Sequence, residues 1–293
     1  MSQRAPLAPA LCATPTDRPS AAGQTRSERM RTVDPHELAA IPGHAAVLDM
    51  DDVALFLDLD GTLAPLCQTP GEVGPDAGRN RLLGELTRRL DGRTAIVSGR
   101  TVEEVDRIVE GTVTAVAGVH GLQRRAADGA LTTARPHPRL DVARGALEAM
   151  AGARRGLAFE DKQLSVALHY RGAPGAAEAV RELAQRVAKA TGLALQEGHM
   201  VVELRTPGPN KGDAVAAFMA EAPFAGARPI YIGDDLTDED AFAAVAAAGG
   251  YGVLVGPERR TFASWRLDSV GDVLDWLGAG LDARPHPALE GSR

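Results

Sequence analysis

The sequence predicts an α/β protein with a parallel sheet flanked by helices and an inserted α+β domain. The first observation is a series of short, wholly apolar runs separated by segments with helical spacing. Such runs are typical of parallel strands that are buried on both faces. The second observation is a clean alternation of apolar and polar residues over 164–170, which indicates a half-buried antiparallel strand.

The elements of the predicted core follow one another in a regular order. Strands are expected at 54–57, 94–97, 114–119, 229–232 and 252–255. Helices are expected at 34–50, 76–90, 102–109 and 241–248, with a further helix from Asp213 onward. In a sheet of this kind, ligands bind outside the carboxyl ends of the strands.

The inserted domain is predicted at residues 140–209, in the order helix, strand, strand, helix, strand, strand. Its helices are expected at 139–154 and 176–191, and they would cover the face that carries Leu164, Val166, Leu168 and Tyr170. The opposite, polar face would stay open. Proline-containing segments at 135–138 and 207–209 are natural hinges, so the core comprises residues 34–139 and 210–281.

Composition limits the class of protein. The chain has 293 residues and a net charge of −7, which argues against a nucleic-acid binder. Residues 1–33 lack periodicity and are predicted to form a disordered leader, with a loose tail at 282–293. Two cysteines, Cys12 and Cys67, provide no disulfide framework, and no apolar stretch approaches the roughly 20 residues that span a bilayer. A cytoplasmic protein without a membrane anchor is therefore predicted.

The strongest chemical signal is the motif Asp58-Leu59-Asp60-Gly61-Thr62-Leu63, which follows the first predicted strand. Two acids at this spacing converge on the mouth of the sheet, and Gly61 permits a sharp turn. One carboxylate can attack phosphorus to form an aspartyl phosphate, while the other protonates the leaving oxygen and activates water. The alternative, an acidic helix N-cap, is disfavoured by the complete motif.

Two shorter motifs suit an anionic ligand. Ser98-Gly99-Arg100 ends the second strand and offers a hydroxyl and backbone N–H groups, although an ordinary N-cap would look the same. Lys211 begins a helix, where the helix dipole disfavours a cation. Its ammonium could neutralise a nucleophilic carboxylate and a phosphate; a solvated surface lysine is the alternative.

The last motif is the acidic run from Gly233 to Asp240, after another apolar strand. Five carboxylates in seven positions repel one another unless a cation lies between them. Hard oxygen ligands favour Mg²⁺, which also bridges to phosphate. Part of the run would serve as the N-cap of the next helix.

The order of the four motifs resembles that of the haloacid dehalogenase-like (HAD) phosphohydrolases, which implies a HAD-like Rossmannoid core with an inserted cap. Within this superfamily, residues 45–280 resemble the trehalose-6-phosphate phosphatase family. The motifs that carry this narrower likeness are Gly118-Val119-His120-Gly121, Glu160-Asp161-Lys162 with Ser165 and 169–171, and 202–207 before Asn210. Leu59 stands where the family commonly has an aromatic residue, and little consequence is expected.

The resemblance implies roles for individual residues. Asp58 would be the nucleophile and a Mg²⁺ ligand, and Asp60 the general acid/base with its backbone carbonyl on the metal. Asp234 would complete the ligands, with Asp235 as a further candidate and Asp238 tuning the site. Phosphate or substrate contacts would come from the remaining core residues Leu59, Gly61, Thr62, Ser98, Gly99, Arg100, His120, Asn210 and Lys211. Sugar contacts would come from the cap residues Glu160, Lys162, His169, Arg171, Glu203 and Arg205, for which cross-strand ion pairs are the alternative.

The implied activity is Mg²⁺-dependent hydrolysis of trehalose 6-phosphate. Related sugar phosphatases, acting on sucrose phosphate, mannosyl- or glucosyl-3-phosphoglycerate or a hexose phosphate, share the core motifs, and only the cap separates them. A non-catalytic phosphosugar sensor would have a broken core motif, and none is broken. A nicotinamide oxidoreductase is disfavoured because no GxGxxG follows a predicted strand. The length leaves no room for a fused glycosyltransferase, so a synthase partner would be a separate protein.

Overall fold

The computed structural model describes residues 39–40, 48–67 and 69–283. The expected leader and residues 284–293 of the expected tail lie outside these residues, as does most of the helix expected at 34–50. Within that range, Ala39–Ala40 form the short strand β1, and residues 48–50 are not helical. The helix prediction is therefore wrong at these positions, where parallel pairing of β1 with β13 replaces local helical spacing.

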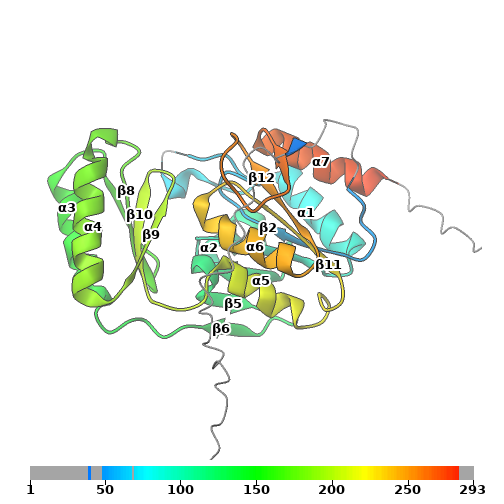
Figure 1. Ribbon diagram of the computed structural model, residues 1–293, viewed down its shortest axis with the longest axis horizontal. Helices are drawn as coiled ribbons and strands as arrows, with labels where there is room; N and C mark the ends of the chain where they lie inside the picture. Colours follow the sequence, from blue (N-terminus) through cyan, green and yellow to red (C-terminus); the bar gives the residue numbers. More distant parts are fainter. Residues whose placement is uncertain (1–38, 41–47, 68, 284–293) are drawn as a thin grey trace, which may run out of the picture. The chain divides into compact units, whose positions relative to one another are not determined.

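The core is a nine-stranded sheet in the order β1-β13-β12-β11-β2-β3-β4-β5-β6 (Figure 1). Its central strands are β2 (Val53–Leu57), β3 (Thr94–Val97), β4 (Ala115–Gly118), β11 (Arg228–Gly233) and β12 (Tyr251–Val255), all at predicted positions. The strands from β1 to β4 in this order run parallel. The apolar pattern does not predict β13 (Trp265–Leu267) or the antiparallel edge strands β5 (Gln123–Arg125) and β6 (Leu131–Thr133).

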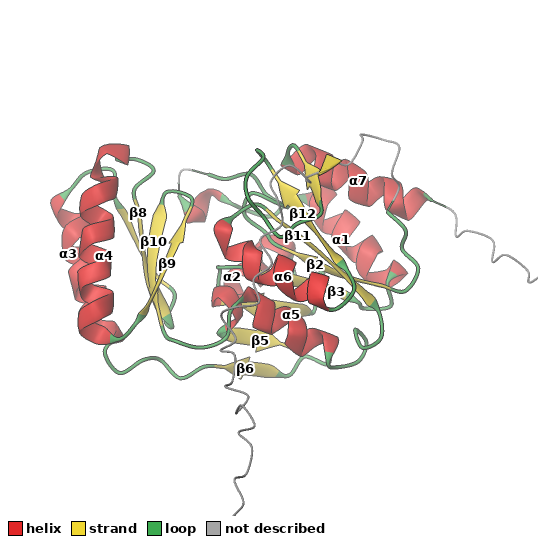
Figure 2. Ribbon diagram, in the orientation of Figure 1, coloured by secondary structure: helices red, strands yellow, loops and turns green. Residues whose placement is uncertain are grey.

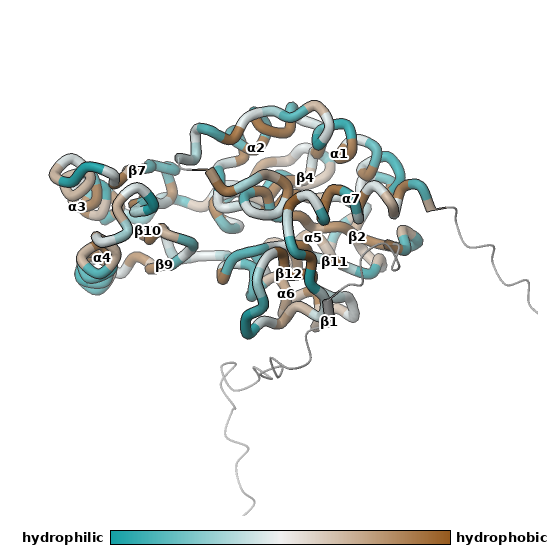
Figure 3. The backbone as a smooth tube through the Cα atoms, turned by 90° about the horizontal axis from the view of Figure 1, so that it is seen from above, coloured by the Kyte–Doolittle hydropathy of each residue, from teal (hydrophilic) through white to brown (hydrophobic). Residues whose placement is uncertain are grey.

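Alternate residues of each central strand enter two separate hydrophobic clusters. Leu55, Ile96 and Ile232 face helices α1 (Ala77–Arg89), α2 (Val102–Val109) and α7 (Val270–Asp282). Phe56, Val97 and Tyr231 face α5 (Lys211–Met219) and α6 (Glu239–Ala247). Both faces of the sheet are thus covered, which explains its continuously apolar strands (Figures 2 and 3). Among the described residues, no helix is long and apolar enough to cross a membrane.

The inserted segment has the predicted order of elements. It consists of α3 (Leu140–Ala153), β7 (Ala158–Asp161), β8 (Ser165–His169), α4 (Ala177–Thr191), β9 (Ala194–Gly198) and β10 (Val201–Arg205). The strands form an antiparallel sheet in the order β7-β8-β10-β9, with α3 and α4 packed against Val166, Leu168 and Tyr170 (Figure 1). Leu164 departs from the prediction, because it packs with Val119 and Leu122 of the core.

Register places four residues in one row across this cap sheet. Glu160 pairs with Ala167, Ala167 with Glu203, and Glu203 with Gln196. Directly paired residues share a face, so the three polar side chains lie on the face away from α3 and α4.

Two chain segments connect the cap to the core, and they are joined to each other. The backbone N–H of His137, on the entering segment, donates to Thr206 Oγ1 on the leaving segment at 3.1 Å. The backbone N–H of Thr206 in turn donates to the carbonyl of Leu164 at 2.9 Å. The two connections therefore form one hydrogen-bonded joint.

Candidate active site

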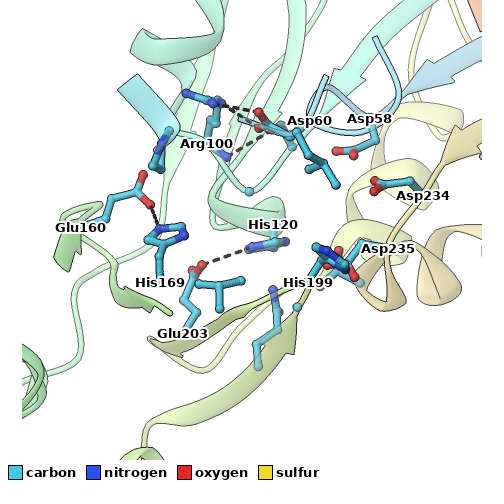
Figure 4. Close-up of a pocket in the computed structure, with 18 of the residues that line it drawn as sticks. Asp58, Asp60, Arg100, His120, Glu160, His169, His199, Glu203, Asp234 and Asp235 are labelled. Carbon is cyan, nitrogen blue, oxygen red and sulfur yellow. Dashed lines mark hydrogen bonds and ion pairs between the residues drawn. The ribbon is translucent and has the colours of Figure 1, made fainter. Parts of the chain in front are cut away.

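The carboxyl ends of three parallel strands and the first turn of α5 meet at one pocket. Asp58 and Asp60 follow β2, Ser98 follows β3, Asp234 follows β11, and Lys211 begins α5. The pocket is lined by these residues together with Gly99, Arg100, His120 and Asp235 of the core and Glu160, Lys162, His169, Arg171 and Glu203 of the cap (Figure 4). Asp58 and Lys211 are 153 positions apart in the sequence. They come into contact because the carboxyl end of β2 and the first turn of α5 lie at the same edge of the sheet.

Lys211 bridges two carboxylates at the base of the pocket. Its Nζ donates to Asp58 Oδ1 at 2.8 Å and to Asp238 Oδ1 at 2.6 Å, and the residue is 2% exposed. Burial disfavours the ammonium, but Asp238 and Asp58 outweigh it and raise the pKa of Lys211. Lys211 therefore carries its charge at neutral pH beside the Asp58 carboxylate.

Asp58, Asp234 and Asp238 bring carboxylate oxygens within 4.8 Å of one another. Burial raises the pKa of Asp58 to about 7, an effect that Lys211 opposes and Asp238 reinforces. Burial and the neighbouring Asp58 raise the pKa of Asp234 to about 9. Asp234 Oδ1 is buried and finds no hydrogen-bond partner in the described part of the chain. Crowded, desolvated oxygen donors of this kind fit a hard divalent cation.

Asp238 has a different position in this cluster from the other two acids. Its Oδ1 accepts from Lys211 and from the Tyr231 hydroxyl at 2.6 Å, and its Oδ2 accepts from the Asp235 backbone N–H at 2.9 Å. Both oxygens are thus engaged within the protein. The oxygens left for a cation belong to Asp58 and Asp234, and the carboxylate of Asp235 also faces the pocket.

Gly61 allows the Asp234 carboxylate to approach the turn that follows β2. Its φ of +83° lies in the left-handed region, and a Cβ there would lie 2.1 Å from Asp234 Oδ2. Any other residue would displace that carboxylate.

Asp60 is held from the side by Arg100. The guanidinium Nε and Nη2 donate to the two carboxylate oxygens at 2.7 and 2.8 Å. A bidentate pair fixes both the position and the orientation of the carboxylate. Asp60 therefore lies at the pocket wall next to Asp58.

Several predicted site residues lie outside the pocket lining. Leu59 packs in the hydrophobic core, and Thr62 is fully buried with an Oγ1 that has no partner among the described residues. Asn210 caps α5, since its side chain accepts from the backbone N–H of Asp213 at 2.9 Å. Gly61 and Arg205 are also absent from the described lining residues.

The polar cap residues form a chain of ion pairs and hydrogen bonds. Lys162 Nζ lies 2.8 Å from Glu203 Oε2 and 3.8 Å from Glu160 Oε2, while His169 Nε2 is 2.7 Å from Glu160. The structure thus contains the predicted cross-strand pairing, and the same side chains line the pocket. Burial opposes ionisation of Glu203, but the charge of Lys162 and a hydrogen bond with His120 hold the pKa of this carboxyl well below its usual range.

His120 connects the core to the paired polar residues of the cap, and its backbone conformation is unusual. Its Nε2 lies 3.4 Å from Glu203 Oε2. Val119 and His120 both have left-handed φ values, of 46° and 54°, which are costly for residues other than glycine. Strain of this kind persists where surrounding structure fixes it and often accompanies functional sites. Burial lowers the pKa of His120 although Glu203 opposes it, which favours the neutral imidazole.

Two wall segments are not predicted by the motifs. One is the loop of Leu66, Cys67, Thr69, Pro70 and Val73, and the other is the β9–β10 hairpin with Gln196, Gly198, His199 and Val201. Arg171 joins them, because its guanidinium donates to the backbone carbonyls of Cys67 and His199. Strand pairing with Glu203 places Gln196 of the hairpin at the pocket, and this pairing is visible only in the structure. The loop offers no periodic signal.

This arrangement of acids, hydroxyl and lysine on a parallel sheet with an inserted cap defines a HAD-like phosphohydrolase. A HAD-like hydrolase from Bacteroides thetaiotaomicron has the same fold, with a TM-score of 0.56 at 13% identity over 77% of this chain and 98% of that one. The family model for trehalose-phosphatase matches residues 56–270. The chain belongs to the trehalose-phosphatase family of phosphoric monoester hydrolases.

Individual relatives agree with this assignment. The trehalose-6-phosphate phosphatase of Escherichia coli K12 is 42% identical over 76% of this chain and 85% of its own length. A probable trehalose-phosphate phosphatase of Sinorhizobium fredii is 40% identical over 71% of this chain and 80% of its own. A crystal structure of a trehalose-6-phosphate phosphatase related protein matches with a TM-score of 0.64 at 29% identity, covering 77% of this chain and 95% of that one.

Proposed function

We propose that this phosphatase hydrolyses trehalose 6-phosphate to trehalose and phosphate, with Asp58 as the nucleophile. The observation that carries the proposal is the buried contact between Lys211 and Asp58 directly below a cap face lined with paired charges. The lysine holds a reactive carboxylate at the strand end, and the cap offers fixed hydrogen-bonding groups for a sugar.

Hydrolysis proceeds in two displacements. A carboxylate oxygen of Asp58 attacks phosphorus, and the bond from phosphorus to the sugar oxygen breaks. Asp60, oriented by Arg100, gives its proton to that oxygen. Asp60 then takes a proton from water, the water oxygen attacks phosphorus, and phosphate leaves with Asp58 regenerated. Lys211 and Ser98, which line the pocket, are proposed to hold the phosphoryl oxygens. The phosphate contact of Thr62 stays a prediction, because this residue is buried outside the described lining.

Mg²⁺ is the proposed cofactor. Asp58 and Asp234 would hold it, with the backbone carbonyl of Asp60 and the carboxylate of Asp235 as further ligands. When bound, the ion offsets negative charge on the phosphoryl oxygens. The buried, unpartnered Asp234 Oδ1 and the raised pKa values of both acids support a cation at this position.

Metal removal is expected to abolish turnover and to lower stability. EDTA should stop phosphate release, and added Mg²⁺ should restore it. Because the cation relieves repulsion among buried carboxylates, it should also raise Tm in a differential scanning measurement at pH 8. Full activity in a chelated, metal-free preparation would contradict the proposed cofactor.

Gly61→Ala is expected to weaken divalent-cation binding, because the new Cβ would lie on the Asp234 carboxylate. Calorimetric titration of the purified variant with Mg²⁺ would measure this loss directly. Gly111→Ala is the matched control, since Gly111 has a φ of +68° with nothing within 4 Å of the added Cβ. Both variants carry left-handed strain of about 1–2 kcal/mol. Equal Mg²⁺ affinities would show that Gly61 does not act through Asp234.

Substrate preference is tested by phosphate release over a panel of sugar phosphates. Trehalose 6-phosphate should give the highest kcat/KM; a higher value with sucrose phosphate, a glycosyl-3-phosphoglycerate or a hexose phosphate would favour a related sugar phosphatase.

Glu203→Gln should raise KM for trehalose 6-phosphate at least about tenfold, because a buried charged partner is lost. It should leave KM for p-nitrophenyl phosphate nearly unchanged. Equal changes for both substrates would contradict sugar contact.

Two further predictions complete the proposed setting. A separate trehalose-6-phosphate synthase would supply the substrate, since the reaction consumes a phosphorylated disaccharide. A cytoplasmic location stays a prediction from cysteine content and composition.

A further inference from the structure

Arg205 ends β10 on the same face as Glu203, but its guanidinium does not enter the pocket formed by the described residues. It is 5% exposed and makes contacts in two directions. Nη1 donates to the side-chain Oε1 of Gln196 at 3.2 Å. Nη2 donates to the backbone carbonyls of Gly208, at 3.3 Å, and of Pro209. The guanidinium therefore joins the cap wall to the segment that leads into α5.

The first contact fixes the orientation of Gln196. This residue lines the pocket on β9 and pairs directly with Glu203 on β10. Because its amide oxygen is turned toward Arg205, the NH₂ group of Gln196 is left to donate to a ligand. Glu203 and Glu160 are acceptors on the same row of the sheet. Gln196 thus adds a hydrogen-bond donor to a row whose other polar side chains, Glu160 and Glu203, accept hydrogen bonds.

The second contact fixes the start of α5. Pro209 directly precedes Asn210, whose side chain and that of Asp213 form a capping box at the helix N-terminus. Lys211 follows as the first helical residue, with its Nζ 2.8 Å from Asp58. A shift of the Gly208–Pro209 backbone would therefore carry the ammonium away from the nucleophile. Displacing a catalytic group by about 1 Å lowers the rate on the order of 100-fold.

We propose that Arg205 is a positioning residue that couples the sugar wall to the phosphate site, acting on sugar specificity through Gln196 and on phosphoryl transfer through Lys211. The inference rests on the proposed function of this site. It differs from the sugar-contact role that the sequence suggests for Arg205, because the guanidinium acts through two other groups. A sugar contact would affect only substrates that carry the sugar.

The test compares four single variants and the Arg205→Met/Gln196→Ala double variant with trehalose 6-phosphate and with p-nitrophenyl phosphate. Arg205→Met removes both contacts and Arg205→Lys retains charge with a smaller donor group, so a folded variant is available if one is unstable. Gln196→Ala removes the sugar-side partner alone. Arg125→Met is the matched control, since Arg125 is partly buried and donates to the Asp106 carboxylate and the Thr114 carbonyl, none of which is among the described residues that line the pocket. Circular dichroism at the assay temperature gives the folded fraction to which every rate is normalised.

Arg205→Met should lower kcat about tenfold or more with both substrates, since Lys211 serves both. It should raise KM for trehalose 6-phosphate several-fold, as Gln196→Ala should alone, and the two effects on KM should not add in the double variant. Arg205→Lys should show a smaller loss of kcat. Arg125→Met should lower Tm without changing kcat or KM of the folded protein.

Two results would overturn the coupling role. One is an Arg205→Met variant with unchanged kcat for p-nitrophenyl phosphate, which would leave only a sugar contact. The other is an Arg205→Met variant that resembles Arg125→Met, with lower Tm and unchanged kinetics. If the wild-type enzyme preferred another sugar phosphate, the proposed substrate would fail, while the p-nitrophenyl phosphate measurements would still decide the role of Arg205.

Discussion

Asp58→Asn is expected to abolish turnover, with kcat lowered by at least about four orders of magnitude. The amide cannot form the phosphoryl-enzyme, and it also replaces a negatively charged metal ligand with a neutral one. Asn has nearly the same volume as Asp, so the packing around this buried position is preserved. Phosphate release under saturating Mg²⁺ measures the loss.

Folding should survive the Asp58→Asn substitution. Burial raises the pKa of Asp58 to about 7, against an unfolded value of about 3.9, so its ionisation costs folding free energy as pH rises through this window. The neutral amide removes that cost while Lys211 keeps its contact with Asp238. In metal-free buffer at pH 8, Tm should match or exceed that of the wild type. A rate near that of the wild type would exclude Asp58 as the nucleophile.

Lys211→Arg is expected to lower kcat by about 10²–10³-fold although the charge is retained. The ammonium lies between Asp58 and Asp238 at 2.8 and 2.6 Å in a fully buried site, where a compact, three-donor group fits. A planar guanidinium is larger and presents its donors in a fixed fork, so it cannot make both contacts without moving the acids. Steady-state kinetics with p-nitrophenyl phosphate isolates this effect from sugar binding.

Lys189→Arg is the matched control for Lys211→Arg. Lys189 lies on α4 in the cap and is exposed, so the same chemical change there should leave kcat and Tm unaltered. Overpacking at Lys211 would also cost about 1–3 kcal/mol of stability, which thermal unfolding would record separately. A kcat for Lys211→Arg within about threefold of the wild type would mean that charge alone suffices at this position.

The core strands were predictable because burial on both faces forces a continuous apolar run, as at Thr94–Val97. The strands β5 and β6 lack this signal, since each has three residues and β6 is wholly exposed. Their pairing with β4 depends on tertiary contact rather than on local pattern. The short strand β1 likewise exists through its pairing with β13.

The gathering of acids and lysine was predictable because strand ends of a parallel sheet converge. The sequence could not reveal that Asp238 would be fully engaged by Lys211, Tyr231 and a backbone N–H. Alternation correctly placed Arg205 on the face of Glu203, but a long side chain can turn along the sheet toward carbonyls of another segment. Periodicity specifies a face and leaves the hydrogen-bond partner open.

The hydrogen-bonded joint between His137 and Thr206 has a consequence for the energetics of substrate capture. Two covalent connections joined to each other act as a short tether between the cap and the core. A short tether gives Glu203 a high effective concentration near His120, on the order of millimolar or more. The contact between Glu203 and His120 therefore resembles an intramolecular binding step, which loses little translational entropy.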